Sequence, residues 1–379
     1  MDRLKVHILY EYSVHKRPHS SAYIRLLRPL FHPSLQHQIE VTAGMTYKGQ
    51  NVDVVILDRL WRPDISLPLA EQLVKEVHSS GARMIYSLDD IFLDLPDQRK
   101  DWPTEAHLQV VRFLLSAADG ILVTTPMLKE RLTKFNPNIA VVPHALDESL
   151  LKSYQSTNID LPPDLSGTPT EAFNSTIQYI FNKLQVVQKK RITIGYMGTA
   201  THDDDLMMVF PALQAISERH RGKVELQIIG AIGHGQTRQM LKKLPGRLIS
   251  LTSNQSEYPQ FLAWFSSQVR WDIAIAPLRD TSFNRCKSDI KFLDYSILGA
   301  AGIYSCIPAY EETVRHQETG WLVDNNINSW IEALETLLTN EQLRKQIATN
   351  ANRYLHHERI LAHCAFWWIE AIKMLLNRT

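Results

Sequence analysis

The sequence predicts an α/β protein made of two doubly wound domains, and three observations lead to this prediction. Short apolar runs rich in β-branched residues alternate with amphipathic helical segments, and this alternation occurs twice along the chain. A stretch that begins rich in Pro, Gly, Ser and Thr, residues 151–189, separates the two series. The 379 residues are enough for two hydrophobic cores. We therefore expect Rossmann-like domains at 1–150 and 190–359, joined by a linker or insertion at 151–189.

The composition is that of an ordinary globular protein. A formal net charge of +1 with 44% hydrophobic residues does not suggest a bulk electrostatic attraction to nucleic acid. The three cysteines are scattered, so the sequence encodes neither a disulfide framework nor a zinc site. The apolar run near the N-terminus is too short for a secretory signal, and no window has the ~18–20 apolar residues of a membrane span. We expect a cytoplasmic protein, with peripheral contact to the inner face of a membrane left open.

The first half contains five apolar runs that predict parallel strands. They are residues 5–10, 52–57, 83–88, 120–124 and 139–143. Ser20 and Ser21 come after the loop beyond the first run, Arg59 follows the second, and Asp89 and Asp90 follow the third. Ligands gather beyond the carboxyl ends of parallel strands, so we expect these side chains near the mouth of a site. A simple N-cap for the helix that begins near residue 22 explains the two serines equally well.

Three acids in the first half, Asp89, Asp90 and Asp94, form a D-D-x-x-x-D pattern with two interpretations. Hard cations prefer carboxylate oxygens, so a metal site is one interpretation. The other is that the acids are polar groups facing a substrate.

The second half repeats the alternation of strands and helices. The predicted strands are residues 191–197, 224–229, 249–251 and 273–276. Gly198 and Thr199 stand at the end of the first of these strands. The stretch 271–305 reads as strand, loop, helix, glycine turn and strand. Ser288 stands where an N-cap belongs, and the helix behind it carries an apolar stripe at helical spacing.

The charges on this helix are unusual. Lys287 precedes the predicted cap and Lys291 lies in the first turn, where a cation opposes the partial positive charge of a helix N-terminus. An anion bound at the helix start would explain both lysines. Asp294, one turn further, could accept hydrogen bonds from the hydroxyls of the same ligand. The alternative is a solvated helix face that carries a lysine–aspartate pair.

The segment that contains this helix carries a family resemblance. The segment KSDIKFLDYSILGAAGIYSCIPAYEETVRHQETGWLV resembles the donor-binding half of family 4 retaining glycosyltransferases of the GT-B fold. In particular it resembles a bacterial polysaccharide or O-antigen subset with a "PL-x-D…FN…KS-x-x-K-x-L-E-Y" pattern. Asp294 occupies the place of the acid that holds the donor ribose. The family's first paired acid falls at Cys286 and is missing. The Arg and Lys that usually follow the glycine at 198 are missing too.

The resemblance implies a retaining glycosyltransferase of the hexosyltransferase type, without cofactor or metal. It implies that the final helix, 360–379, crosses back to the first domain. The second domain would bind a nucleotide-diphosphate sugar, and the first a glycan or lipid-linked acceptor. The residues implied for the donor diphosphate are Gly198, Thr199, Lys287, Ser288 and Lys291, with Asp294 for the ribose. On the acceptor side we expect Ser20, Ser21 and Asp89, with Asp90 and Arg59 as candidates for acceptor positioning and no assigned catalytic base.

Two other functions stay open, and the departures from the pattern motivate the first of them. One is a catalytically silent nucleotide-sugar-binding partner of another glycosyltransferase. The other is a sugar-nucleotide epimerase on the same fold. The aromatic C-terminal helix also has two interpretations, as a helix packed on the first domain or as a helix lying on a membrane surface.

Overall fold

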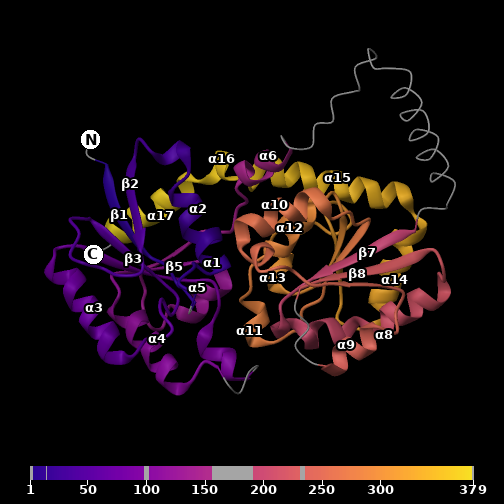
Figure 1. The fold of residues 1–379 in the computed structure, drawn as a ribbon, viewed down its shortest axis with the longest axis horizontal. Coiled ribbons are helices and arrows are strands. Elements are labelled where there is room, and N and C mark those ends of the chain that lie inside the picture. The colour runs from indigo at the N-terminus through magenta and orange to yellow at the C-terminus, as the bar shows by residue number, and fades with distance from the viewer. Residues whose placement is uncertain (1–2, 14, 98–101, 156–190, 231–234, 378–379) are drawn as a thin grey trace, which may run out of the picture.

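The structure is a computed structural model that describes residues 3–13, 15–97, 102–155, 191–230 and 235–377. Two α/β domains lie side by side, and the last helices run from the second domain back to the first (Figure 1). The predicted fold class is confirmed. From residue 156 onward, the predicted linker or insertion and its expected helix lie outside the described residues.

The first domain is built on a parallel sheet of six strands in the order β2-β1-β3-β4-β5-β6. The strands are β1 (Leu4–Leu9), β2 (Ile39–Gly44), β3 (Val54–Asp58), β4 (Arg83–Leu88), β5 (Gly120–Val123) and β6 (Ile139–Val141). Five of them were predicted. Strand β2 was not, because it lies at the sheet edge with only one buried residue and lacks an apolar run.

Helices cover both faces of this sheet. They are α1 (Ser20–Ala22), a π-helical turn (Tyr23–Leu27), α2 (Arg28–Leu30), α3 (Leu67–Ser79), α4 (Glu105–Ala117), α5 (Pro126–Leu132) and α6 (Glu148–Gln155). Short 3₁₀ turns cover Pro33–Leu35 and Phe92–Asp97. The buried faces of α3 and α4 pack on one side of the sheet, in the same core cluster as β3 and β4.

The second domain repeats this architecture with the order β12-β11-β10-β7-β8-β9. Its strands are β7 (Ile192–Met197), β8 (Val224–Ile229), β9 (Gly246–Ile249), β10 (Ile273–Ala276), β11 (Ala301–Ser305) and β12 (Trp321–Val323). Its helices are α8 (Asp203–Arg219), α9 (Gly235–Leu241), α10 (Tyr258–Gln268), α11 (Ser282–Arg285), α12 (Ile290–Ile297), α13 (Pro308–Glu311), α14 (Ile327–Thr339) and α15 (Glu341–Glu358). Two 3₁₀ turns cover Ala200–His202 and Asn254–Ser256.

Both sheets reverse their winding direction at one point. In the first sheet the chain leaves β1 toward β2 on one side, whereas β3 lies on the other side. In the second sheet β8 and β10 flank β7 in the same manner. Loops diverge at such a switch point and leave a crevice beyond the strand ends. The crevices between β1 and β3 and between β7 and β10 are therefore the places where ligands are expected.

The C-terminal helices α16 (Leu361–Cys364) and α17 (Phe366–Asn377) return to the first domain, as Figure 1 shows in yellow. The apolar face of α17 is buried in a core cluster with β1, β3 and β6; its fully buried members include Trp368, Ile369 and Ile372. The indole of Trp368 also donates to the carbonyl of Arg25. The prediction that this helix crosses back and packs is confirmed.

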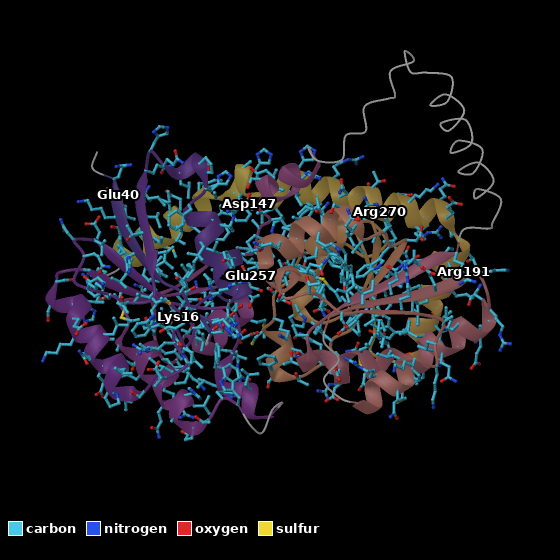
Figure 2. The ribbon with its side chains drawn as sticks, viewed as in Figure 1. Lys16, Glu40, Asp147, Arg191, Glu257 and Arg270 are labelled. Carbon is cyan, nitrogen blue, oxygen red and sulfur yellow. The ribbon has the colours of Figure 1, made fainter. Side chains whose placement is uncertain are left out.

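The two chain crossings between the domains lie side by side. Leu146 and Ile360 form a parallel bridge, in which the Leu146 N–H donates to the Arg359 carbonyl over 2.9 Å and the Leu361 N–H donates to the Leu146 carbonyl over 2.9 Å. Further contacts tie the domains together away from this bridge. Arg17 pairs with Glu257, which lies at the domain boundary (Figure 2), and the Thr125 hydroxyl donates to the Cys286 carbonyl over 3.0 Å.

Candidate functional site

A cleft of about 480 Å³ lies between the two domains, beyond the carboxyl ends of both sheets. The first domain contributes residues that follow β1, β3 and β4, and the second contributes residues that follow β7 and β10. The lining residues include His19, Arg59, Asp90, Trp102, Thr199, His202, Asp205, Arg279, Asn284 and Lys287. The two crevices expected from the sheet topology therefore face each other across one cleft.

On the first-domain side, Arg59 is the central charge of the cleft wall. It has a positive φ of 48°. Its guanidinium pairs with Glu11 over 2.9 Å and with Asp89 over 3.1 Å, and it lies 4.9 Å from the ring centroid of Phe92. These carboxylates raise the pKa of Arg59 against the opposing effect of burial. Arg59 is therefore a fixed cation in the wall.

A second buried cation lies beneath Arg59. Arg25 pairs with Asp58 and donates to the Ser87 hydroxyl over 2.8 Å. Burial alone would raise the pKa of Asp89, but Arg25 and Arg59 outweigh it and hold that pKa well below its usual range. Asp89 is thus an ionised anchor for two arginines. Sequence reasoning missed Arg25, since a single arginine in a helical segment carries no signal of burial.

The two predicted serines differ from the expected caps. Helix α1 begins at Ser20, so the N-cap position belongs to His19, whose side chain makes no capping hydrogen bond. The cap interpretation of Ser20 and Ser21 is therefore wrong. The Ser21 hydroxyl instead accepts a hydrogen bond of 3.4 Å from Arg59, which places it beside the cleft wall.

The three acids of the D-D-x-x-x-D pattern do not converge. Asp89 faces the two arginines, Asp90 lies 3.5 Å from the Lys287 ammonium of the other domain, and Asp94 pairs with Arg131 over 2.7 Å. Each carboxylate therefore has a cationic partner of its own. Within the described ranges, no group of three or more His, Cys, Asp or Glu residues could hold a metal ion.

On the second-domain side, the key helix starts later than predicted. Helix α12 begins at Ile290 and its N-cap position is Asp289, so the assignment of Ser288 as N-cap is wrong. Lys287 precedes the helix, on the segment between α11 and α12. The Ser288 hydroxyl lies 3.3 Å from Nδ1 of His144, and burial lowers the pKa of that histidine to about 4.

Asp289 is held by the crossing segment rather than by its own helix. Arg359 donates to both of its carboxylate oxygens, over 2.8 and 3.0 Å, and the Thr313 hydroxyl donates over 2.8 Å. Arg359 also donates to the His144 carbonyl over 2.8 Å. Sequence reasoning missed this pair, because its members are 70 residues apart. The pair fixes the start of α12 against the domain junction.

Lys291 lies in the first turn of α12 and is buried, with only 9% of its surface exposed. Its ammonium lies 4.9 Å from the ring centroid of Tyr196 and makes no hydrogen bond to any part of the chain that the structure describes. Burial lowers the pKa of Lys291 to about 8, against the opposing effect of Asp205. The alternative of a solvated helix face is therefore wrong.

Asp294 is the second unusual charge on this helix. It is 3% exposed, and its Oδ1 atom has no hydrogen-bond partner among the described residues. Burial raises its pKa to about 7, although Lys291 acts in the opposite direction. A buried carboxylate and a buried ammonium without hydrogen bonds are costly for the folded protein, which indicates a role other than stability.

Asp205 organises the floor of the cleft between β7 and β10. Its carboxylate accepts from His202 Nδ1 over 2.8 Å, from the Arg279 N–H over 2.8 Å and from the Asn284 amide over 3.1 Å. Asn284 in turn donates to the Arg279 carbonyl over 2.9 Å. Sequence reasoning assigned these four residues no role in the site, although three consecutive aspartates after a strand could have drawn attention to them.

Gly198 and Thr199 lie where the sequence predicted, at the end of β7. Thr199 lines the cleft, and its hydroxyl lies 2.8 Å from that of Thr201. A Cβ atom at position 198 would lie 2.6 Å from the Tyr196 hydroxyl, so only glycine fits beneath that ring. Tyr196 is the same ring on which the Lys291 ammonium rests. The glycine thus allows the close packing of the floor under Lys291.

Residues 191–340 match the model of a protein family described as "Glycosyl transferases group 1". The matched segment runs from β7 to the end of α14 and includes α12. A comparison of the sequence with curated proteins finds no match.

Several solved structures are similar to the whole chain. HepE from Anabaena, crystallised with UDP and glucose, is 13% identical, with a TM-score of 0.61 over 98% of this chain and 100% of that one. A glycosyltransferase from Rickettsia africae is 13% identical, with a TM-score of 0.61 and 100% of both chains covered. Sucrose-phosphate synthase from Thermosynechococcus elongatus is 12% identical, with a TM-score of 0.59 over 86% of this chain and 75% of that one. These proteins have the GT-B fold, and the likeness confirms that fold for this chain.

The described helices have no membrane-spanning candidate. None of them combines the length and the apolar character that crossing a bilayer requires.

Proposed function

We propose that this protein is a glycosyltransferase that moves a sugar from a nucleotide-diphosphate sugar to an acceptor hydroxyl with retention of anomeric configuration. The match of residues 191–340 to the glycosyltransferase family model supports the class of reaction. HepE, a protein of the same fold, was crystallised with UDP and glucose, which supports UDP as the nucleotide to test first.

The observation that carries the proposal is the pair of buried charges on α12. The Lys291 ammonium and the Asp294 carboxylate make no mutual salt bridge and no hydrogen bond to the other described residues from these buried atoms. A diphosphate at the start of α12 would give the ammonium an anionic partner, together with the free N–H groups of the first turn. The hydroxyls of a ribose would donate to the Asp294 carboxylate. Both burial costs would then be offset in the donor complex.

The reaction that we propose needs charge stabilisation more than proton transfer by the protein. The acceptor oxygen bonds to the anomeric carbon while the bond from that carbon to the diphosphate oxygen breaks. The acceptor proton moves to the departing diphosphate, as the resemblance to retaining GT-B enzymes implies. Lys287 and Lys291 would stabilise the negative charge that develops on the leaving group. Gly198, Thr199 and Ser288 would line the same diphosphate subsite.

The first-domain wall would position the acceptor. Arg59 and Asp90 line the cleft opposite the proposed diphosphate subsite, with Ser21 and Asp89 behind them. Lys287 approaches Asp90 across the cleft. Through this contact, donor binding at Lys287 would affect the position of Asp90 on the acceptor side. We propose no metal ion and no resident cofactor for the reaction.

The test is an incubation of the purified full chain with a panel of radiolabelled UDP-, GDP- and dTDP-sugars, with and without glycoside acceptors. Transfer or donor hydrolysis with an α-anomeric product from an α-linked donor is the expected result, read by ¹H NMR coupling of the anomeric proton. Tight nucleotide binding without turnover would reject the enzyme in favour of a silent binding partner. Conversion of the donor into another nucleotide sugar, without acceptor, would reject it in favour of an epimerase.

A further inference from the structure

His202 lines the main cleft, and the reaction proposed above gives it no role. It ends the 3₁₀ turn that follows β7 and stands directly before α8. Its side chain is 15% exposed, so part of the imidazole ring remains accessible although most of it is enclosed. The ring is therefore within reach of a ligand in the cleft.

Asp205 fixes the orientation of this ring. Nδ1 of His202 lies 2.8 Å from a carboxylate oxygen of Asp205. Burial alone would raise the pKa of Asp205, but hydrogen bonds from His202 and from the Arg279 N–H outweigh it and lower that pKa. An ionised carboxylate can only accept, so Nδ1 carries a proton and donates it to the hydrogen bond. Nε2 makes no hydrogen bond to any residue that the structure describes, and this nitrogen is left for a ligand.

Two lysines on the α12 side of the cleft keep the ring neutral. Burial and the charges of Lys291 and Lys287 lower the pKa of His202 to about 4. The hydrogen bond to Asp205 acts in the opposite direction but does not outweigh them. Tyr196 connects the two sides, because its ring lies 4.9 Å from the Lys291 ammonium and its hydroxyl donates to the His202 carbonyl over 3.5 Å. Without a ligand, Nε2 is therefore an acceptor near pH 7.

The other charged or titratable side chains that line the cleft have partners. They are Arg279 from the second domain and His19, Arg59 and Asp90 from the first. Each of them lies within ion-pair distance of a group of opposite charge. Lys287 is itself paired with Asp90, whereas Lys291 has no hydrogen bond within the described ranges. The positive charge that most needs an anion is therefore the one that acts most strongly on His202.

A diphosphate in the subsite proposed at Lys287 and Lys291 would reverse this balance. The anion would offset the two ammonium charges, and it would offer oxygen acceptors to Nε2. A charged imidazole donates from both nitrogens, so Nδ1 would still donate to Asp205 while Nε2 donates to a phosphate oxygen. Hydrogen bonds between charged groups are stronger than neutral ones. The protonated ring is thus favoured in the donor complex and disfavoured without it.

We propose that His202 takes up a proton when a nucleotide-diphosphate sugar binds, and that its Nε2–H then donates to an oxygen of the diphosphate. The proton comes from solvent and returns to solvent when the nucleotide diphosphate leaves. His202 keeps this proton during transfer, so the acceptor proton still passes to the departing diphosphate. The inference rests on the proposed function and adds a proton-dependent contact to its donor subsite. Because the complex binds one more proton than the free protein, donor affinity should fall as the pH rises through neutrality.

The test is isothermal titration calorimetry of the full chain with UDP-glucose, GDP-glucose and dTDP-glucose at pH 6, in two buffers of different ionisation enthalpy. The phosphates of these probes do not titrate near neutral pH, so the protons that are taken up go to the protein. Lys291, with a pKa of about 8, is already charged at pH 6. Asp294, with a pKa of about 7, should change its proton count alike in wild type and variant. The difference between the two proteins therefore isolates His202.

The variant is His202→Gln, whose amide keeps a neutral donor but cannot take up a proton. The wild type should take up more protons per bound donor than this variant, by about 0.5 or more. The variant should bind the donor about tenfold more weakly at pH 6 but less than about twofold more weakly at pH 8.5, where the contact is no longer charged. His220→Gln changes a histidine that pairs with Glu335 at the other end of α8. It is the matched control and should behave as the wild type.

Equal proton uptake in the wild type and in His202→Gln would overturn the proposal. An equal loss of affinity at pH 6 and pH 8.5 would also overturn it, since His202 would then only support the structure of the subsite. Turnover is measured separately on the same preparations. Turnover accompanied by equal proton uptake would reject the proton-dependent contact alone. Absence of both nucleotide-sugar binding and turnover would reject the glycosyltransferase and its donor subsite.

Discussion

Replacing Lys291 with methionine should make the protein more stable and less active at the same time. Methionine has a similar length and volume, so it should preserve the packing over Tyr196 while it removes the buried charge. A residue that costs the unliganded fold stability but binds the leaving group should show both effects. A lysine that only supports the fold should show neither.

The magnitude of the stability effect follows from the burial of the ammonium, and that of the rate effect from the loss of a leaving-group contact. Lowering the pKa of a lysine from 10.5 to about 8 corresponds to about 3 kcal/mol of cost for the charged form in the folded state. Since methionine leaves Asp294 without its nearby cation, the observed gain should be smaller, about 1–2 kcal/mol. Loss of one contact that stabilises a leaving group typically costs about 10²–10³-fold in rate.

The pH dependence of the free energy of unfolding tests the buried charge of Lys291 independently. The folded protein releases the Lys291 proton near pH 8, whereas the unfolded chain holds it up to about pH 10.5. Between these values the unfolded state binds more protons, so the free energy of unfolding of the wild type should rise with pH. The Lys291→Met variant should lack this component of the rise. Urea denaturation at pH 7, 8 and 9 measures it.

Two controls accompany this variant. Lys345→Met changes an exposed lysine paired with Glu341 and should alter neither stability nor turnover by much. Lys287→Ala should lower turnover without the gain in stability, since Lys287 is only partly buried. If Lys291→Met were less stable than the wild type and kept its donor affinity and turnover, the diphosphate subsite on α12 would be wrong.

Two further predictions concern metal and the domain junction. Turnover should survive EDTA, because Asp89, Asp90 and Asp94 each have a cationic partner; loss of turnover with EDTA and its recovery with Mg²⁺ or Mn²⁺ would contradict this. Arg359→Met should destabilise the protein by about 3–5 kcal/mol, since it leaves the buried Asp289 carboxylate without its bidentate partner. Adding Asp289→Asn should restore much of that loss in a double-mutant cycle by urea denaturation, and additive losses would argue against direct coupling.

The sequence predicted the buried strands well because each is a short run of β-branched and apolar residues between turn signals. The strand predicted at 249–251 was placed too late, because β9 (Gly246–Ile249) is not buried. Strand β3, Val54–Asp58, is buried along its whole length, and its pattern was legible. Edge strand β2 was missed since its exposed side chains carry no such pattern. The start of α12 was misplaced by one residue, because Arg359 recruits Asp289 and leaves Ser288 to His144. Contacts between residues so far apart in the sequence leave no local sequence pattern.

The candidate site was predictable where charge conflicted with local structure. Lys291 stood out because a cation at a helix start is locally unfavourable, and the structure adds that it is buried. The burial of Asp294 had no sequence signal, because carboxylates on helices are usually solvated. In the Glu11–Arg59–Asp89 network, the sequence placed Arg59 and Asp89 at strand ends, but nothing in it indicated Glu11 or the pairing of the three. Its three members come from the ends of three different strands, and only the fold brings them together.

The bridge between Leu146 and Ile360 joins the two interdomain crossings, so we expect them to act as one hinge. Two separate connections would let the domains slide and twist. Two segments of the chain that are hydrogen-bonded to each other leave one axis of rotation. We expect motion about that axis to open and close the cleft without sliding one wall along the other. Arg59 and Asp90 would therefore meet the α12 side in the same register at every closure. In the proposed transfer, such restricted motion would align donor and acceptor more accurately.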